Sequence, residues 1–260
     1  MKVLFIGDVF GRPGRKAVAA IVPGLVAEQG ISLVVANVEN VAGGVGVTPD
    51  TVDEILAAGV HVMTSGNHIW DKREVNDVIG FEPRLLRPAN YPASNPGRGS
   101  LVAKTAEGAK VGIINVEGNV FMRAKTCPFQ RAREEALAIR QETRVIILDM
   151  HAEATSEKKA MGWHLDGQVS LVIGTHTHVQ TSDETILPRG TAYLTDAGMT
   201  GPHESVIGVK KEIVIERFLT NLPSRFEPAT GNVRLQGAIV EIDPESGKAV
   251  GIQRVDEPLK

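Results

Sequence analysis

Short apolar runs recur along the chain, separated by segments that carry helix-start signals. The runs cover 3–6, 33–36, 60–63, 111–116, 145–148, 169–173, 192–194 and 238–242. Continuous apolar strands indicate burial on both faces. Helices are predicted over 13–28, 50–58, 75–79, 130–141, 157–163 and 210–219. The alternation of strands and helices through the first 175 residues predicts an α/β fold built in layers.

Local signals mark several ends of these elements. Pro13 and the pair Thr48-Pro49 each precede a predicted helix, and Asp71 with Glu74 forms a capping-box-like pair before 75–79. Two hairpin-type turns are expected at 107–108 and 245–247. The Pro- and Gly-rich stretch 82–99 fits a linker or a long active-site loop, and we favour the loop. One domain over residues 1–260 is therefore predicted.

Composition excludes several classes of protein. The chain has only 7 Phe, 2 Trp and 2 Tyr, too few for the stacking platforms of single-strand binders. A net charge of -3 argues against stable binding of duplex nucleic acid, which needs a basic footprint. A small anionic substrate remains compatible with this charge. A homo-oligomer is left open.

The chain carries no signal for secretion or for a membrane. The single cysteine, Cys127, cannot form an intramolecular disulfide. The first apolar run is too short for a signal peptide, and no run approaches the roughly 20 residues of a membrane span. We expect a cytoplasmic protein.

Polar side chains follow five of the predicted strands, at the point where each strand ends. The segments are Gly7-Asp8, Glu39-Asn40, Gly66-Asn67-His68, Asp149-Met150-His151 and Gly174-Thr175-His176-Thr177-His178. Because parallel strands bring their carboxyl ends to one edge of a sheet, we expect one site built from all five. The alternative, that these residues merely cap strands and helices, explains any single one but not the coincidence of five.

The types of these residues indicate a metal site. In His176-x-His178, alternate residues after an extended strand can reach one or two neighbouring metals. Imidazole, carboxylate and amide donors without thiolate suit Fe, Mn or Zn. The candidate ligands exceed what one tetrahedral ion needs, so two metals sharing a carboxylate are predicted. They are Asp8, Glu39, Asn40, Asn67, His151, His176 and His178.

The ordered motifs resemble those of the calcineurin-like metallophosphoesterase superfamily, whose signature runs G-D, G-D, G-N-H, H, G-H-x-H. Longer blocks are similar to the bacterial YmdB-like phosphodiesterases. They are GDVFGRPGR from 7, VENVAGG from 38, TSGNHIWD from 64, LRPANYP from 86, LDMHAEATSEK from 148, GTHTHVQTSD from 174 and TDAGMTGP from 195. The resemblance implies a four-layer α-β-β-α metallophosphoesterase sandwich, two metal ions, and hydrolysis of small phosphodiesters, including 2',3'-cyclic nucleotides to 3'-nucleotides.

The resemblance also implies roles for single residues. One metal would be held by Asp8, Asn40 and His178, and the other by Asn67, His151 and His176. Glu39 would bridge them, a bridging hydroxide would attack phosphorus, and His68 would be the general acid. Arg87, Asn90 and His203 are candidates for contact with the substrate, with a loop-structural role as the alternative.

Two positions depart from the superfamily pattern. Phe10 stands where the usual G-D-x-H motif has its histidine, and Glu39 stands where the bridging Asp is usual. Asn40 is the candidate replacement for the missing imidazole. The rival hypothesis is a regulatory or RNA-related binding protein with a largely structural metal site.

Overall fold

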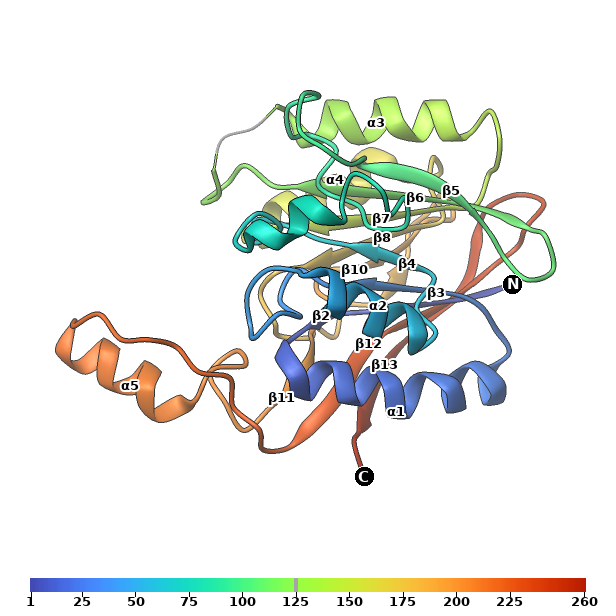
Figure 1. Cartoon of the computed structure of the whole chain (residues 1–260). Helices are drawn as coiled ribbons and strands as arrows, with labels where there is room; N and C mark the ends of the chain where they lie inside the picture. The colour runs from blue at the N-terminus through green and yellow to red at the C-terminus, as the bar shows by residue number, and fades with distance from the viewer. Residues whose placement is uncertain (124–125) are drawn as a thin grey trace.

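The computed structural model describes residues 1–123 and 126–260. Within these residues two β-sheets lie face to face, with helices on both outer faces (Figure 1). The first sheet has the order β2-β11-β12-β1-β3-β4, and β13 also pairs with β12. Its strands are β1 (Lys2–Ile6), β2 (Asp8–Val9), β3 (Ile31–Asn37), β4 (Val62–Thr64), β11 (Met199–Pro202), β12 (Val233–Ile242) and β13 (Ala249–Pro258).

The second sheet has the order β5-β6-β7-β8-β10-β9. Its strands are β5 (Ser100–Lys104), β6 (Lys110–Glu117), β7 (Ile146–His151), β8 (Leu171–Thr175), β9 (Thr185–Ile186) and β10 (Ala192–Leu194). The helices are α1 (Gly11–Gln29), α2 (Pro49–Ala57), α3 (Pro128–Ile139), α4 (Thr155–Leu165) and α5 (Lys211–Thr220). None of the described helices is both long and apolar enough to cross a membrane.

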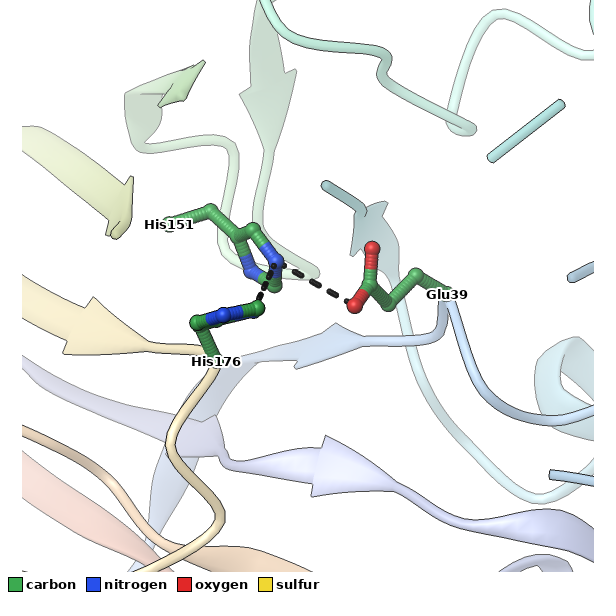
Figure 2. A group of neighbouring side chains, drawn as sticks. All are labelled: Glu39, His151 and His176. Atoms are coloured by element: carbon green, nitrogen blue, oxygen red, sulfur yellow. Dashed lines mark hydrogen bonds and ion pairs between the residues drawn. The ribbon is translucent and has the colours of Figure 1, made fainter. Parts of the chain in front are cut away.

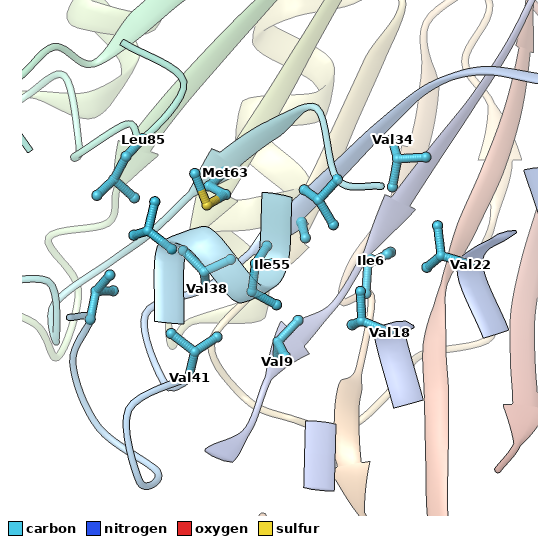
Figure 3. Close-up of a cluster of buried hydrophobic side chains, with 14 of the residues drawn as sticks. Ile6, Val9, Val18, Val22, Val34, Val38, Val41, Ile55, Met63 and Leu85 are labelled. Carbon is cyan, nitrogen blue, oxygen red and sulfur yellow. The ribbon is translucent and has the colours of Figure 1, made fainter. Parts of the chain in front are cut away.

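Three apolar cores separate the four layers. On β1, Ile6 lies beside Val18 and Val22 of α1 in the outer core shown in Figure 3. Leu4 belongs to the same core, while Val3 and Phe5 lie on the opposite face of the strand. Val3 and Phe5 belong to the inter-sheet core, together with residues of β6, β7 and β8. The third core joins the outer face of the second sheet to α3 and α4. The chain is therefore the predicted four-layer α-β-β-α sandwich, and central strands such as β1, β7 and β8 are largely apolar because both of their faces are covered.

Some local predictions were wrong. The predicted helix over 75–79 is a short 3-10 helix, η1, over Arg73–Asp77. The predicted capping pair of Asp71 and Glu74 does not form, because the residue before η1 is Lys72 and no side chain caps it. The Asp71 carboxylate instead binds His68. Both predicted turns do join paired strands, β5 to β6 and β12 to β13.

The carboxyl ends of strands in both sheets meet at one side of the sandwich. The prediction of a single sheet edge was wrong in this respect, since β1, β3 and β4 lie in one sheet and β7 and β8 in the other. The strands run parallel within each group, and His151 of β7 lies level with Thr175 of β8 and Glu117 of β6. This alignment sets the position of the histidine-bearing segments.

Candidate metal centre

Three donor groups surround the Nε2 atom of His151 at the end of β7. This atom lies 3.0 Å from Asn67 Oδ1, 3.2 Å from Glu39 Oε1 and 3.2 Å from His176 Nδ1. Figure 2 shows Glu39 and His176 converging on it from separate strands. Ligands that share one ion at about 2.1 Å lie roughly 3.0 to 3.4 Å from one another. The spacing of these donors therefore suits a common metal ion.

A second group of donors lies on the other side of Glu39. His178 Nε2 is 3.2 Å from the Asn40 amide nitrogen and 3.8 Å from Asp8 Oδ1. Asp8 Oδ1 is buried and has no hydrogen-bond partner among the described residues. The Asn40 amide also lies 3.4 Å from Glu39 Oε1, and a half-turn of this amide places its oxygen toward the other donors. Glu39 Oε1 thus lies close to donors of both groups, as expected of a bridging ligand.

Each of the three histidines has one ring nitrogen held by an acceptor. His151 Nδ1 lies 2.9 Å from Thr175 Oγ1, His176 Nε2 lies 3.1 Å from Glu153 Oε2, and His178 Nδ1 lies 2.9 Å from the Ile207 carbonyl. An N–H that donates to such an acceptor leaves the lone pair on the other nitrogen. All three free nitrogens face the donor groups described above. The rings are oriented as metal ligands.

A buried hydrogen-bond chain supports His151 from behind. Thr175 Oγ1 donates to Asp149 Oδ1 at 2.7 Å, and Asp149 Oδ2 accepts from Asn37 Nδ2 at 3.1 Å. Burial raises the pKa of Asp149 to about 6, against the opposing effects of His151 and of hydrogen bonds from Thr64 and Thr175. Sequence reasoning missed Asn37 and Asp149 as partners, although both lie in the strands that carry the ligands.

Burial and mutual charge interactions shift the pKa values of the carboxylates and imidazoles of the cluster. Burial raises the pKa of Asp8. Burial would also raise the pKa of Glu39, but His151 and the His68 backbone lower it to about 2. For His151, burial opposes protonation, yet Glu39, Asp8 and Asp149 raise its pKa to about 9. Burial and the neighbouring His151 lower the pKa of His176 to about 3, so this ring is neutral, as a ligand must be.

His68 lies beside this cluster but takes no part in it. Its backbone N–H donates to Glu39 Oε2 at 2.9 Å, and its Nδ1 lies 2.7 Å from Asp71 Oδ2. The His68 side chain is 37% exposed, whereas that of His151 is fully buried. A carboxylate therefore orients the His68 imidazole on one side, while its other side is open to solvent. This arrangement suits a proton donor. The sequence did not predict Asp71 as the partner of His68, because its position before 75–79 suggested a helix cap.

The three candidates for substrate contact lie in different surroundings. The Arg87 guanidinium donates to the carbonyls of Pro88, Asn95 and Pro96 at 3.0 to 3.4 Å. Asn90 is buried and binds the backbone of Glu117, and it borders a cleft beside His68. His203 Nε2 lies 3.1 Å from the Met199 carbonyl. Among the described residues, Arg87 and His203 do not line either cleft beside the cluster. Their hydrogen bonds to backbone carbonyls instead stabilise the loops in which they lie.

A buried ion pair fixes the segment that carries His176 and His178. Lys158 Nζ of α4 donates to Asp196 Oδ2 at 2.6 Å, and both side chains are 1% exposed. The same carboxylate accepts the backbone N–H of Thr177 at 3.3 Å and its hydroxyl at 2.8 Å. Thr177 lies between the two histidines, so Asp196 anchors both. Neither member of the ion pair was predicted.

Lys158→Ala should lower the free energy of unfolding by about 3 to 5 kcal/mol, because it leaves the buried Asp196 carboxylate without its cation. Lys159→Ala is the matched control, since this neighbouring lysine is 58% exposed and pairs with Asp183 at the surface. We expect a change of about 0 to 1 kcal/mol for Lys159→Ala. Urea unfolding of both variants checks this, and equal losses would contradict a special role for the buried pair.

The chain is similar over nearly its whole length to several known proteins. The family model described as "YmdB-like protein" matches residues 4–255. The 2',3'-cyclic-nucleotide 2'-phosphodiesterase of Bacillus subtilis is 46% identical over 255 residues, which cover 98% of this chain and 96% of that protein. A crystal structure of a hypothetical protein from Thermus thermophilus matches with a TM-score of 0.92 at 39% identity, over 99% of both chains. A phosphatase structure from Mycoplasma pneumoniae matches with a TM-score of 0.93 at 34% identity, over 99% of this chain and 93% of that one. The chain belongs to the YmdB-like family.

Proposed function

We propose that this protein is a metal-dependent phosphodiesterase that hydrolyses small nucleotide phosphodiesters, with 2',3'-cyclic nucleotides as the main substrates and 3'-nucleotides as products. The observation that carries the proposal is the set of three histidines, His151, His176 and His178. In each of them one ring nitrogen contacts an acceptor, and the other ring nitrogen faces carboxylate and amide donors. The name of the Bacillus subtilis relative supports this choice of substrate.

The donor groups suit two transition-metal ions. Asn67, His151 and His176 would hold one ion, and Asp8, Asn40 and His178 would hold the other. Glu39 would bridge them. Nitrogen and oxygen donors without sulfur suit Fe, Mn or Zn, of which we propose Fe. When bound, the ions would lower the pKa of a water that attacks phosphorus and offset the charge on the phosphoryl oxygens.

His68 would supply the proton for the leaving group. In a 2',3'-cyclic nucleotide, the ribose 2'-oxygen leaves while it stays tethered to the product, and as an alkoxide it is a poor leaving group unless it is protonated. The Asp71 carboxylate lies 2.7 Å from Nδ1 of His68 and orients the ring. The second ring nitrogen is then free to face the substrate, since His68 lines the clefts beside the cluster.

The protein loaded with Fe, Mn or Zn is expected to bind two ions per chain and to hydrolyse 2',3'-cyclic AMP. Metal analysis and product chromatography on the same sample check both points. 3'-AMP serves as the control substrate and should react more slowly. With two divalent ions, two carboxylates and a hydroxide, the charge of the site would sum to about +1. This charge matches a phosphodiester monoanion better than the dianion of 3'-AMP.

Two results would contradict the proposal. A saturated stoichiometry of one ion or none would remove the dinuclear site. Metal-replete protein that turns over no phosphodiester would favour a regulatory or RNA-related binding protein with a structural metal.

A further inference from the structure

Two clefts flank the donor cluster and meet at His68 and His176. The first, which we call the aromatic cleft, has a volume of about 700 Å³, and its walls include Asn67, Trp70, Tyr91 and Phe121. The second, the apolar cleft, has a volume of about 550 Å³, and its walls include Phe10, Ile207, Phe226 and Pro228. Both volumes lie in the range of small-molecule sites, roughly 300 to 1,000 Å³. The cluster therefore has a ligand-sized cleft on each side.

Each cleft contains a bulky apolar side chain on a left-handed backbone. Ile207 has φ of 47° and is 53% exposed, and Phe121 has φ of 63° and is 87% exposed. Left-handed angles are costly for such residues, above all for a β-branched one. Burial in the core does not offset this cost, because both side chains are exposed. A contact made within the cleft would offset it.

The turn that carries Ile207 does not itself require an isoleucine. Val206 and Val209 exchange backbone hydrogen bonds of 2.9 and 3.0 Å, and Gly208 follows Ile207 with φ of 102°. Two-residue turns with positive φ at both positions favour Asn-Gly or Gly-Gly. The Ile207 carbonyl holds His178, but any residue supplies a carbonyl. What isoleucine adds is its side chain in the apolar cleft.

We propose that the two clefts receive the two organic arms of a linear phosphodiester, such as two nucleosides joined through one phosphate. Phe121 would contact one arm and Ile207 the other. This inference rests on the proposed function, since it places the phosphate at the donor cluster, between the clefts. A 2',3'-cyclic nucleotide has a single nucleoside and fills only one cleft.

The reaction on such a substrate is an ordinary hydrolysis. Water adds to phosphorus and one P–O ester bond breaks, which yields a monoester and a free alcohol. His68 lines both clefts, so it can reach the leaving oxygen on either side. It gives that oxygen a proton and regains one from the attacking water, so the charges balance.

Two nitrophenyl diesters with the same leaving group test the inference. Thymidine 5'-(p-nitrophenyl phosphate) has two large arms, while methyl p-nitrophenyl phosphate has one. Ile207→Gly and Phe121→Gly each remove one wall contact and relieve the left-handed angle. We expect each variant to lower kcat/KM for the thymidine diester about 10-fold or more. Only one of the two variants should lower kcat/KM for the methyl diester.

Asn221→Gly is the matched control. Asn221 has φ of 58° but lies at the end of α5, outside the described walls of both clefts. Its replacement should leave kcat/KM unchanged for both diesters. Thermal melting should show that no glycine variant is less stable than the wild type. If one fails to fold, the asparagine variant at the same position replaces it, since Asn also accepts this angle.

Several outcomes would overturn the inference. One is an unchanged kcat/KM for the thymidine diester in at least one of the two variants, because the substrate would then not use that cleft. Another is an equal loss on both diesters in both variants, which would indicate a disturbed metal cluster. Turnover of 2',3'-cyclic AMP without turnover of either nitrophenyl diester would overturn this inference but leave the proposed function standing. No turnover of any diester would overturn both.

Discussion

His68→Ala is expected to slow the hydrolysis of 2',3'-cyclic AMP by roughly 100-fold to 10,000-fold, the range typical of a lost proton donor. The variant should keep both metal ions, because the His68 ring binds Asp71 and contributes no donor to the cluster. A nitrophenolate leaving group needs little protonation, so His68→Ala should lower the hydrolysis rate of a nitrophenyl diester much less. Steady-state rates on both substrates, with metal analysis of the same sample, check this result.

The comparison between substrates distinguishes acid catalysis from damage to the metal site. A disturbed cluster would slow both substrates about equally, and missing metal would place His68 among the supports of the ligands. His164→Ala is a suitable control, because this half-buried histidine contacts Phe129 and lies outside the described walls of both clefts. Asp71→Asn should show a smaller loss of the same kind as His68→Ala, since it removes only the group that orients the ring.

Glu39→Ala should cause the largest loss of metal among single changes of the donors. Glu39 lies between the two groups, 3.2 Å from His151 and 3.4 Å from Asn40, so its removal affects both ions. Asp8→Ala should remove only the ion held with His178, which leaves about one ion per chain. Metal analysis after extensive dialysis, followed by the rate on 2',3'-cyclic AMP, measures the difference.

Glu39→Gln controls for folding, because it keeps the shape of a side chain that is only 1% exposed. It should retain more structure than Glu39→Ala but bind metal weakly, since the amide lacks the charge that two cations require. Glu153→Ala should cause a smaller loss of metal than Glu39→Ala. This exposed carboxylate supports His176 only from outside the cluster. If Asp8→Ala lost more metal than Glu39→Ala, the bridging role would belong to Asp8.

The apolar pattern predicted a layered α/β fold and the convergence of the polar strand ends, because both depend on local sequence, whereas the four layers were implied by the family resemblance. Apolar runs such as 3–6 show which strands are buried, and the residues after each run must lie at its carboxyl end. Asp8, Glu39, His151 and His176 are brought together as the pattern indicated. Their roles as metal ligands stay predictions.

The missed features depend on contacts between distant parts of the chain. Lys158 lies on a helix where a lysine usually faces solvent, and only the packing of α4 against the second sheet buries it beside Asp196. Asp71 has the sequence context of a helix cap, and the backbone after Asn67 turns it toward His68 instead. The left-handed angle of Ile207 has no signature in its own residue type. Such features follow from tertiary structure and not from periodicity.

The turn between β5 and β6 is a suitable place to attach a reporter or to anchor the protein to a surface. Lys110 begins β6 and Glu117 ends it beside His151, so this turn lies roughly 23 Å from the donor cluster at about 3.3 Å per residue. Gly108 is exposed there, and open space surrounds the position of a side chain. A peptide inserted at Gly108 is expected to leave β5 and β6 unchanged. By contrast, one residue added within β7 would turn His151 toward the opposite face of the sheet.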